Sequence, residues 1–228
     1  MIAKLQKMKR IFNLSHWKSG KLRGAGEATN REWITLIGCI CADGTFIPPC
    51  VIYCAKSGNL QDSWLHDFDP EEHTCHFASS EKGWTNDKLG LKWLEIFDRY
   101  TREKARRGRD WRVLWVDGHG SHLGIEFLSW CIDHRIHVAL YPSHSTHRLQ
   151  PLDIGLFSPL ASYYSTNLSN LIAATNGLLP IGKREFFALF WPAFQKAFSE
   201  KNIKHAWANA GLWPWDPDSV LEPLKPDE

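Results

Sequence analysis

The chain has 228 residues, of which 43% are hydrophobic and 23% are charged. Together with 12 tryptophans and 12 phenylalanines, these fractions exclude a disordered protein, because so much apolar surface must be buried. A net charge of +2 does not indicate any particular class of partner. We expect no membrane span, since the sequence lacks a run of about 18 apolar residues, and its basic start lacks the apolar stretch of a secretory signal.

The first predicted elements form a hairpin. Residues 31–44 are predicted to be a strand that ends in an Asp-Gly turn, and residues 46–55 to be its antiparallel partner. Two prolines, Pro48 and Pro49, would sit at the start of that partner, where a missing N–H costs little. Residues 57–85 are acidic and are expected to be irregular.

The middle of the chain alternates between helices and buried strands. A helix capped by Asn86 or its neighbour is predicted over about 87–105, where apolar residues recur every three to four positions. Residues 111–117 and 136–142 are short apolar runs, typical of central strands that are covered on both faces. A second helix is predicted between them, over about 123–134.

The last third of the chain is predicted to be helical. Residues 151–174 carry an apolar stripe, with a kink expected at Pro159. The aromatic segment 184–198 is expected to break or restart at Pro192, and residues 202–211 form one more short helix.

The order of these elements indicates the fold class. An antiparallel strand pair followed by strands joined through helices predicts an α/β fold with a sheet of mixed direction. We assign residues 1–175 to this domain and residues 176–228 to a helical, aromatic-rich extension with a proline-rich tail.

Two acidic residues follow the two buried strands closely. Asp117 ends the first strand and precedes Gly118, and Asp153 lies in the first turn of the helix beyond the second strand. If the two strands are parallel neighbours, their carboxyl ends share one edge, where α/β proteins place ligand sites. Converging carboxylates bind Mg²⁺ or Mn²⁺, and such ions support cleavage of phosphodiesters. Taken singly, Asp117 could be a turn former and Asp153 a residue favoured by the helix dipole.

Histidines and cysteines give weaker alternatives. A His/Asp metallohydrolase would use Asp117 with four loop histidines, His119, His122, His144 and His147, although histidines that only fix the loops are the preferred interpretation. The six cysteines lie mostly in predicted strands and are expected to be buried free thiols, which suits a reducing compartment.

A basic stretch suggests a contact with nucleic acid. Residues 99–112 hold seven Lys or Arg against two acidic residues, and such clusters bind phosphates. The alternative is an ordinary solvated helix end. The candidate nucleic-acid-binding residues are Arg102, Lys104, Arg106, Arg107 and Arg109.

Several motifs resemble a known family. They are NREWITLIGCICADG, GWTND, LWVDGHGSH, YPSHSTHRLQPLDIGLFSPL and the tail AGLWPWDP. The chain thereby resembles the DDE-superfamily endonuclease domain of pogo-like transposases, within the mariner group. The resemblance implies an RNase H-like fold, DNA as partner, Mg²⁺-dependent strand cleavage and transfer, and action in the nucleus; it also allows a homodimer. It makes Asp117 the second acid of the catalytic triad and Asp153 the third.

The resemblance also implies a departure from the family pattern. The first acid of the triad and the strand that bears it would precede Met1, so we expect both to be missing. Alternatively, residues 1–12 fill the slot of that strand, since an empty slot would leave two inner sheet edges unpaired. We therefore expect impaired cleavage. The alternative function is a non-catalytic, domesticated module that binds DNA or protein.

Overall fold

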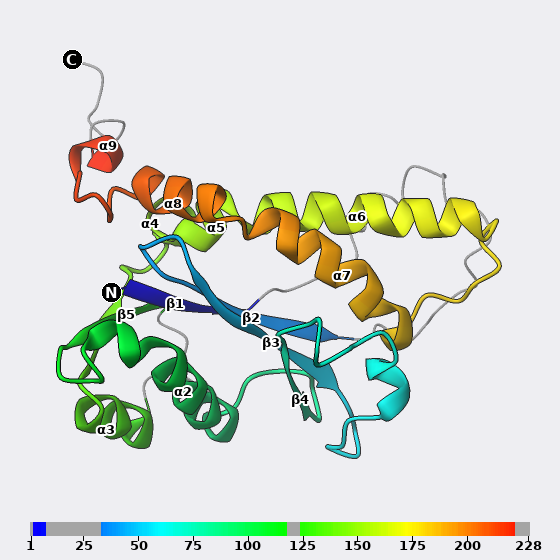
Figure 1. The fold of residues 1–228 in the computed structure, drawn as a ribbon, viewed down its shortest axis with the longest axis horizontal. Helices are drawn as coiled ribbons and strands as arrows, with labels where there is room; N and C mark the ends of the chain where they lie inside the picture. Colours follow the sequence, from blue (N-terminus) through cyan, green and yellow to red (C-terminus); the bar gives the residue numbers. More distant parts are fainter. Residues whose placement is uncertain (1, 8–32, 118–123, 222–228) are drawn as a thin grey trace.

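A six-stranded sheet with helices on both faces forms the body of the molecule (Figure 1). The computed structural model describes residues 2–7, 33–117 and 124–221. The strands are β1 (Ile2–Lys7), β2 (Ile34–Ile40), β3 (Phe46–Cys54), β4 (His76–Ser80), β5 (Arg112–Val116) and β6 (Ile136–Leu140). The helices are η1 (Asp62–Leu65), α2 (Asp87–Thr101), η2 (Glu103–Ala105), α3 (Ile125–Asp133), α4 (Thr146–Leu149), α5 (Pro151–Gly155), α6 (Phe157–Ala174), α7 (Lys183–Ala197), α8 (Glu200–Asn209) and α9 (Asp218–Leu221).

The strand order, β4-β3-β2-β1-β5-β6, confirms the predicted mixed α/β class. β2 pairs antiparallel with β1 and β3, whereas β5 pairs parallel with β1 and β6. The slot expected to be empty is therefore occupied by Ile2–Lys7, and the expectation of a missing strand is corrected in favour of its alternative. The physical reason is the one given above, because β1 satisfies the backbone groups of both inner edges.

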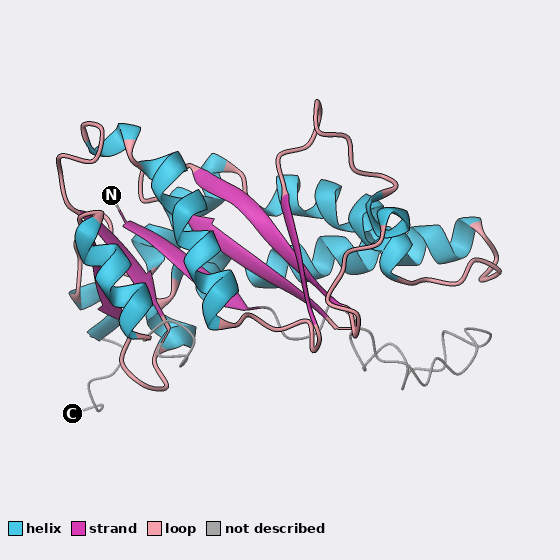
Figure 2. Cartoon of the chain, turned by 90° about the horizontal axis from the view of Figure 1, so that it is seen from below, coloured by secondary structure: helices cyan, strands magenta, loops and turns pink. Residues whose placement is uncertain are grey.

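Two apolar cores lie on opposite faces of the sheet. Even-numbered residues of β2, such as Ile34 and Leu36, belong to the core under α5–α8, and odd-numbered ones, such as Ile37 and Cys39, belong to the core under α2 and α3. This alternation is the period of two of a strand. Figure 2 shows α2 and α3 lying across the strands on one face. The core under α5–α8 includes residues on both sides of position 175, and the division of the chain there stays a prediction.

The two prolines of β3 mark a bulge. The register pairs Cys39 with Ile47 but Ile37 with Cys50, so β3 holds one extra residue around Pro48 and Pro49. Proline is tolerated at such a bulge because the ladder is interrupted there anyway. The shift turns Val51 and Tyr53 towards the core under α5–α8.

Most predicted helices are confirmed, and their exceptions have physical reasons. The Asn86 side chain accepts a hydrogen bond from Leu89 N at 2.9 Å and caps α2, as predicted. The helical region after residue 150 is interrupted at Leu156 rather than kinked at Pro159. α7 continues through Pro192, because buried aromatic residues on both sides of the proline hold the helix against the sheet.

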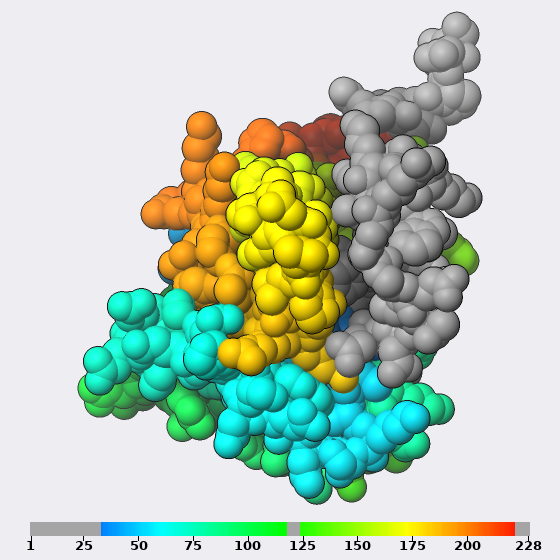
Figure 3. Space-filling model, turned by 90° about the vertical axis from the view of Figure 1, so that its right-hand side faces the viewer, coloured from blue at the N-terminus to red at the C-terminus, as the bar shows by residue number. Residues whose placement is uncertain are grey.

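The acidic segment before β4 packs against the start of α7. Figure 3 shows this segment, in cyan, directly below the junction of α6 and α7, in yellow and orange. The Lys183 ammonium lies 4.5 Å from the ring centre of Trp64, a cation–π contact. β4 was not predicted, because its sequence HFASS is half-buried along its whole length and has no apolar alternation.

A buried ion pair joins α2 to β5. Arg112 and Asp98 are 1% and 4% exposed, and Arg112 Nη1 lies 2.7 Å from Asp98 Oδ1. The guanidinium also donates to Thr101 Oγ1 at 2.9 Å and to the carbonyl oxygen of His134. Such a pair fixes the position of β5, because its charges cannot be left buried without partners.

We predict that Arg112→Met lowers the free energy of unfolding by about 1.5–3 kcal/mol, since Asp98 would lose its buried partner and keep only its pair with the more exposed Arg102. Urea unfolding followed by circular dichroism measures this loss. The matched control is Arg106→Met, which removes an exposed pair with Asp110 and should cost far less, because water screens an exposed pair. Equal losses in the two variants would contradict the prediction.

Candidate functional site

The carboxyl ends of β5 and β6 lie side by side at one edge of the sheet. The two strands are parallel, and Val116 pairs with Leu140. Asp117 and Tyr141 each follow that last pair, and Tyr141 N donates to Val116 O at 3.1 Å. The Asp117 carboxylate is half-buried at this edge, where α/β sheets bind ligands.

α5 carries the other candidate acid, Asp153. Asp153 is half-buried in the first turn of the helix, and its N–H donates to the Gln150 carbonyl oxygen at 3.0 Å. Leu152, fully buried in the core, anchors α5 on the sheet. On the other side α5 packs tightly on α8, since a Cβ added at Gly155 would lie 2.8 Å from Ala206 Cβ.

Tyr141 is the group on which the charges of both carboxylates act. Its phenol is 5% exposed, and its ring centre lies 5.3 Å from that of Trp115. Burial raises the pKa of Tyr141, and the negative charges of Asp153 and Asp117 raise this pKa further. Both carboxylates are thus within electrostatic reach of one buried hydroxyl, although they lie far apart along the chain.

Gln150 is a site residue that the sequence did not single out. Its side chain is 0% exposed, and neither amide atom has a hydrogen-bond partner within the residues that the structure describes. A buried unpaired amide is unfavourable by about 1–3 kcal/mol. Its place three residues before Asp153 makes it a candidate positioning residue, because unsatisfied groups in native proteins concentrate at functional sites.

The donor set suits a hard divalent cation better than zinc. Mg²⁺ is commonly held by one or two carboxylates, with waters and substrate phosphates completing its octahedron, and Asp117 with Asp153 fit that pattern. Within residues 2–7, 33–117 and 124–221, no group of three His, Cys, Asp or Glu side chains is placed to hold a metal. The β1 sequence IAKLQK contributes no acidic residue.

The loop histidines do not form a metal cluster in the described part of the chain. His144 and His147 are exposed, and His147 Nε2 accepts a hydrogen bond from Arg148 Nε at 3.3 Å. The predicted partners His119 and His122 lie outside the described residues.

Four of the six cysteines are buried, as predicted, whereas Cys54 and Cys75 are half-buried. Burial raises the pKa of Cys50 to about 12. Burial likewise raises the pKa of Cys131 to about 12, despite the nearby charge of Arg112. These two thiols therefore stay protonated at neutral pH.

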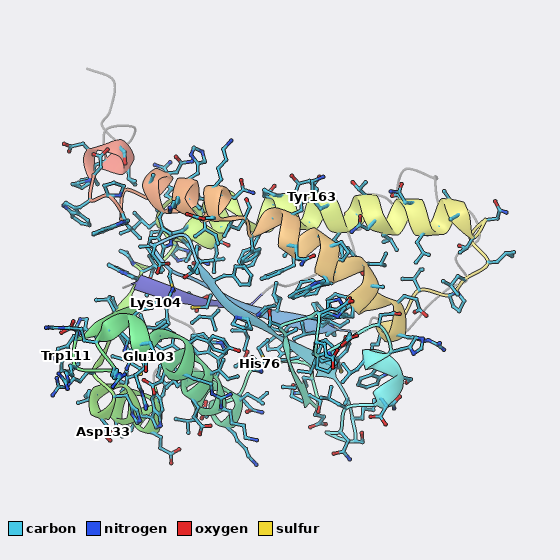
Figure 4. All side chains as sticks on the ribbon, in the orientation of Figure 1. His76, Glu103, Lys104, Trp111, Asp133 and Tyr163 are labelled. Atoms are coloured by element: carbon cyan, nitrogen blue, oxygen red, sulfur yellow. The ribbon has the colours of Figure 1, made fainter. Side chains whose placement is uncertain are left out.

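The predicted nucleic-acid-binding cluster lies at the other end of β5. Lys104 belongs to η2, which precedes the strand, and Figure 4 shows Lys104 and Trp111 near the same end of the molecule. Asp117 follows the carboxyl end, so the five residues of β5 separate the two places by about 16 Å.

Ion pairs engage four of the five predicted basic residues. Arg102 pairs with Asp98, Arg106 with Asp110, Arg107 with Glu103, and Lys104 with Asp43. Arg109 is exposed and has no ion pair with any described residue.

The pair with Asp43 ties η2 to the turn between β2 and β3. Lys104 Nζ lies 2.8 Å from Asp43 Oδ2. Burial raises the pKa of Asp43, but hydrogen bonds from Lys104 and Thr45 outweigh this effect and lower the pKa below its ordinary value. Neither Asp43 nor the turn was linked to the basic stretch by the sequence analysis.

Two curated proteins resemble the chain. One is named "MFS-type transporter clz9", from Cochliobolus lunatus, and is 40% identical over 195 residues, which cover 86% of this chain and 20% of that protein. The other is named "Pogo transposable element with ZNF domain", from Homo sapiens, and is 25% identical over 130 residues, which cover 55% of this chain and 8% of that protein. The chain thus spans at most a fifth of the length of these relatives. Among the described helices, none has the length and apolar character needed to cross a membrane.

Solved structures of the Mos1 mariner transposase share the fold. Its catalytic domain superposes with a TM-score of 0.52 at 12% identity, over 100% of this chain and 84% of that chain. The same domain solved with raltegravir and Mn has a TM-score of 0.52 at 11% identity, over 100% of this chain and 84% of that chain. A pre-cleavage Mos1 transpososome has a TM-score of 0.50 at 11% identity, over 100% of this chain and 56% of that chain. This likeness confirms the RNase H-like arrangement.

A family model matches most of the chain. The model described as "DDE superfamily endonuclease" matches residues 30–207, which is more than half of the chain and includes both Asp117 and Asp153. The match also covers the strands and helices that bring these acids together. The chain belongs to the DDE superfamily of endonucleases, as a transposase-like domain.

Proposed function

We propose that this domain binds DNA together with Mg²⁺ or Mn²⁺ at the edge formed by Asp117 and Asp153, and that residues 1–228 alone cleave DNA poorly. The observation that carries the proposal is that Asp117 and Asp153 both raise the pKa of the buried Tyr141, which follows β6 at the edge shared with β5. A cation held by these carboxylates would stabilise their ionised form, because a nearby opposite charge favours the charged state.

Similar solved structures support a metal and a DNA partner. They include Mos1 catalytic domains with Mn and with Mg, and a pre-cleavage transpososome. In this chain, Asp117 and Asp153 would hold the ion, with Tyr141 and Gln150 beside them. When bound, such an ion activates a water molecule and stabilises the leaving oxygen of a phosphodiester.

Weak cleavage follows from the acids that the chain contributes. Two-metal phosphodiester cleavage holds two ions about 3.5–4 Å apart, and two aspartates are few ligands for such a pair. β1 occupies the central position beside β5, and its sequence IAKLQK contains no acidic residue. The domain therefore acts mainly by binding DNA. We place this action in the nucleus.

The domesticated binding module remains the second candidate function, and the same β1 sequence favours it. Such a module would use the basic end of β5, where Arg109 is exposed and has no ion pair within the described part of the chain. A duplex repeats about every 34 Å, so one duplex could span the 16 Å or so between that end and Asp117. A homodimer also stays a prediction, which analytical ultracentrifugation measures.

The proposed function makes three predictions, and the first concerns the metal. Asp117→Asn and Asp153→Asn should each weaken Mn²⁺ binding by at least about tenfold, since each removes an anionic oxygen ligand. Isothermal titration calorimetry measures the affinity, and exposed Asp133→Asn in α3 serves as the matched control. Unchanged Mn²⁺ affinity in Asp117→Asn would remove the metal role. Strong Mg²⁺-dependent nicking of plasmid by the wild-type chain would overturn the claim of poor cleavage.

The second prediction concerns DNA. Affinity for a duplex should fall steeply with salt, and Arg109→Ala should reduce the slope of log affinity against log salt by about 1 if it contacts one phosphate. Fluorescence anisotropy measures both quantities. Exposed Arg184→Ala in α7 is the control. An affinity that does not respond to salt, or an equal effect of the two substitutions, would count against contact at the basic end.

The third prediction concerns Gln150. Gln150→Met should raise the free energy of unfolding of the metal-free protein by about 1 kcal/mol, because it replaces a buried unpaired amide with an apolar group of similar size. Asn167→Leu is the contrasting control: its Nδ2 donates to Leu189 O at 3.0 Å, so the substitution should destabilise. Chemical denaturation compares the two. A loss of stability in Gln150→Met would show that the amide is satisfied.

A further inference from the structure

The loop that follows α8 presents two tryptophans to solvent. Trp213 is 56% exposed and Trp215 is 70% exposed. Leu212, between them and the helix, is only 9% exposed and belongs to the core under α5–α8. The chain thus turns a smaller apolar residue inward and two large aromatic residues outward, against the usual preference. We call Trp213 and Trp215 the indole platform.

The loop that bears the indole platform is held firmly. Gly211 has a φ of +63°, and a Cβ there would lie 2.3 Å from Asp216 O, so the turn needs glycine. Asp216 N donates to Gly211 O at 3.0 Å, and Leu212 forms an isolated β-bridge with Trp215. A preorganised aromatic surface binds with little loss of conformational entropy.

The indole platform is connected to the candidate site through two packed helices. α8 leads directly into the loop, and Trp207 at its end is fully buried. α8 also packs on α5 through Ala206 and Gly155, and α5 carries Asp153. In Figure 1, α5 and α8 lie close together, and α9, which follows the platform, lies beyond the end of α8.

The charges around the platform indicate which part of a nucleic acid it suits. Asp216 and Asp218 are exposed beside the indoles, so a phosphate chain running directly across them would be repelled. The face of a nucleobase is neutral and stacks on an aromatic ring, independent of sequence. This combination favours a base turned out of the helix over the sugar–phosphate backbone.

We propose that Trp213 and Trp215 stack an unpaired nucleobase of the DNA strand engaged at the Asp117–Asp153 edge. This inference rests on the proposed DNA partner. It adds a base-binding surface to a site that otherwise contacts phosphates and metal. Stacking releases few counterions, so its contribution depends little on salt.

The test compares single-stranded and duplex oligonucleotides of matched sequence by fluorescence anisotropy, with the full 228-residue chain. The double substitution Trp213→Ala with Trp215→Ala should weaken single-strand binding by about fivefold or more. The affinity of this double variant for duplex DNA, and the slope of its log affinity against log salt, should stay unchanged. Trp111→Ala is the matched control, because Trp111 is 57% exposed at the amino end of β5. Circular dichroism verifies that both variants fold.

The outcomes separate this inference from the proposed function. Duplex binding by the wild-type chain without single-strand binding overturns the inference alone, whereas binding of neither overturns both. An equal loss of single-strand affinity in the platform variant and in Trp111→Ala also overturns the inference. A cationic peptide is the competing occupant. If an arginine-rich peptide binds, and loses affinity in Asp218→Asn and in the platform variant while single-strand binding persists, the surface is a peptide site.

Discussion

The parallel pairing of β5 with β6 is the interaction on which the candidate site depends. Its register sets Asp117 level with Tyr141, because both residues follow the pair of Val116 and Leu140. A shift of one residue would turn the buried side chains of β5 towards the opposite face. The ion pair between Arg112 and Asp98 holds the amino end of the same strand. The site is therefore fixed from both ends of one short strand.

The chemistry of the edge follows from what the sheet brings together there. Two carboxylates and a buried phenol are costly neighbours in a medium of low polarity, because like charges repel and the phenol resists ionisation. Gln150 adds an amide whose hydrogen-bonding groups are unpaired among the described residues. A buried amide without partners lowers the stability of the fold, and a bound cation or phosphate can supply a partner for it. The packing of α5 on α8 extends the same rigid unit to the indole platform.

Much of this arrangement could be predicted from sequence. Periodicity and apolar runs predicted the strands that precede Asp117 and Asp153. The parallel order of βαβ units predicted that the two acids share one edge of the sheet. Other features have no local signal. β4 lacks alternation, so only its pairing with β3 defines it, and α7 passes through Pro192 because tertiary packing overrides the local preference. Gln150 is informative only once its burial is known, and the partner of Lys104 is Asp43, 61 residues away.

The central claim is that Asp117 and Asp153 share one metal ion, and metal-directed cleavage of the polypeptide tests it most directly. Fe²⁺ is loaded in place of Mg²⁺, and added hydrogen peroxide oxidises it to Fe³⁺ with release of hydroxide and a hydroxyl radical, while ascorbate regenerates Fe²⁺. The radicals cut the backbone close to the ion, and mass spectrometry locates the cuts. The account predicts cuts near both Asp117 and Asp153 in the same sample, and their joint loss in either single Asn variant. Cuts at only one of the two positions, or cuts that survive both substitutions, would contradict it.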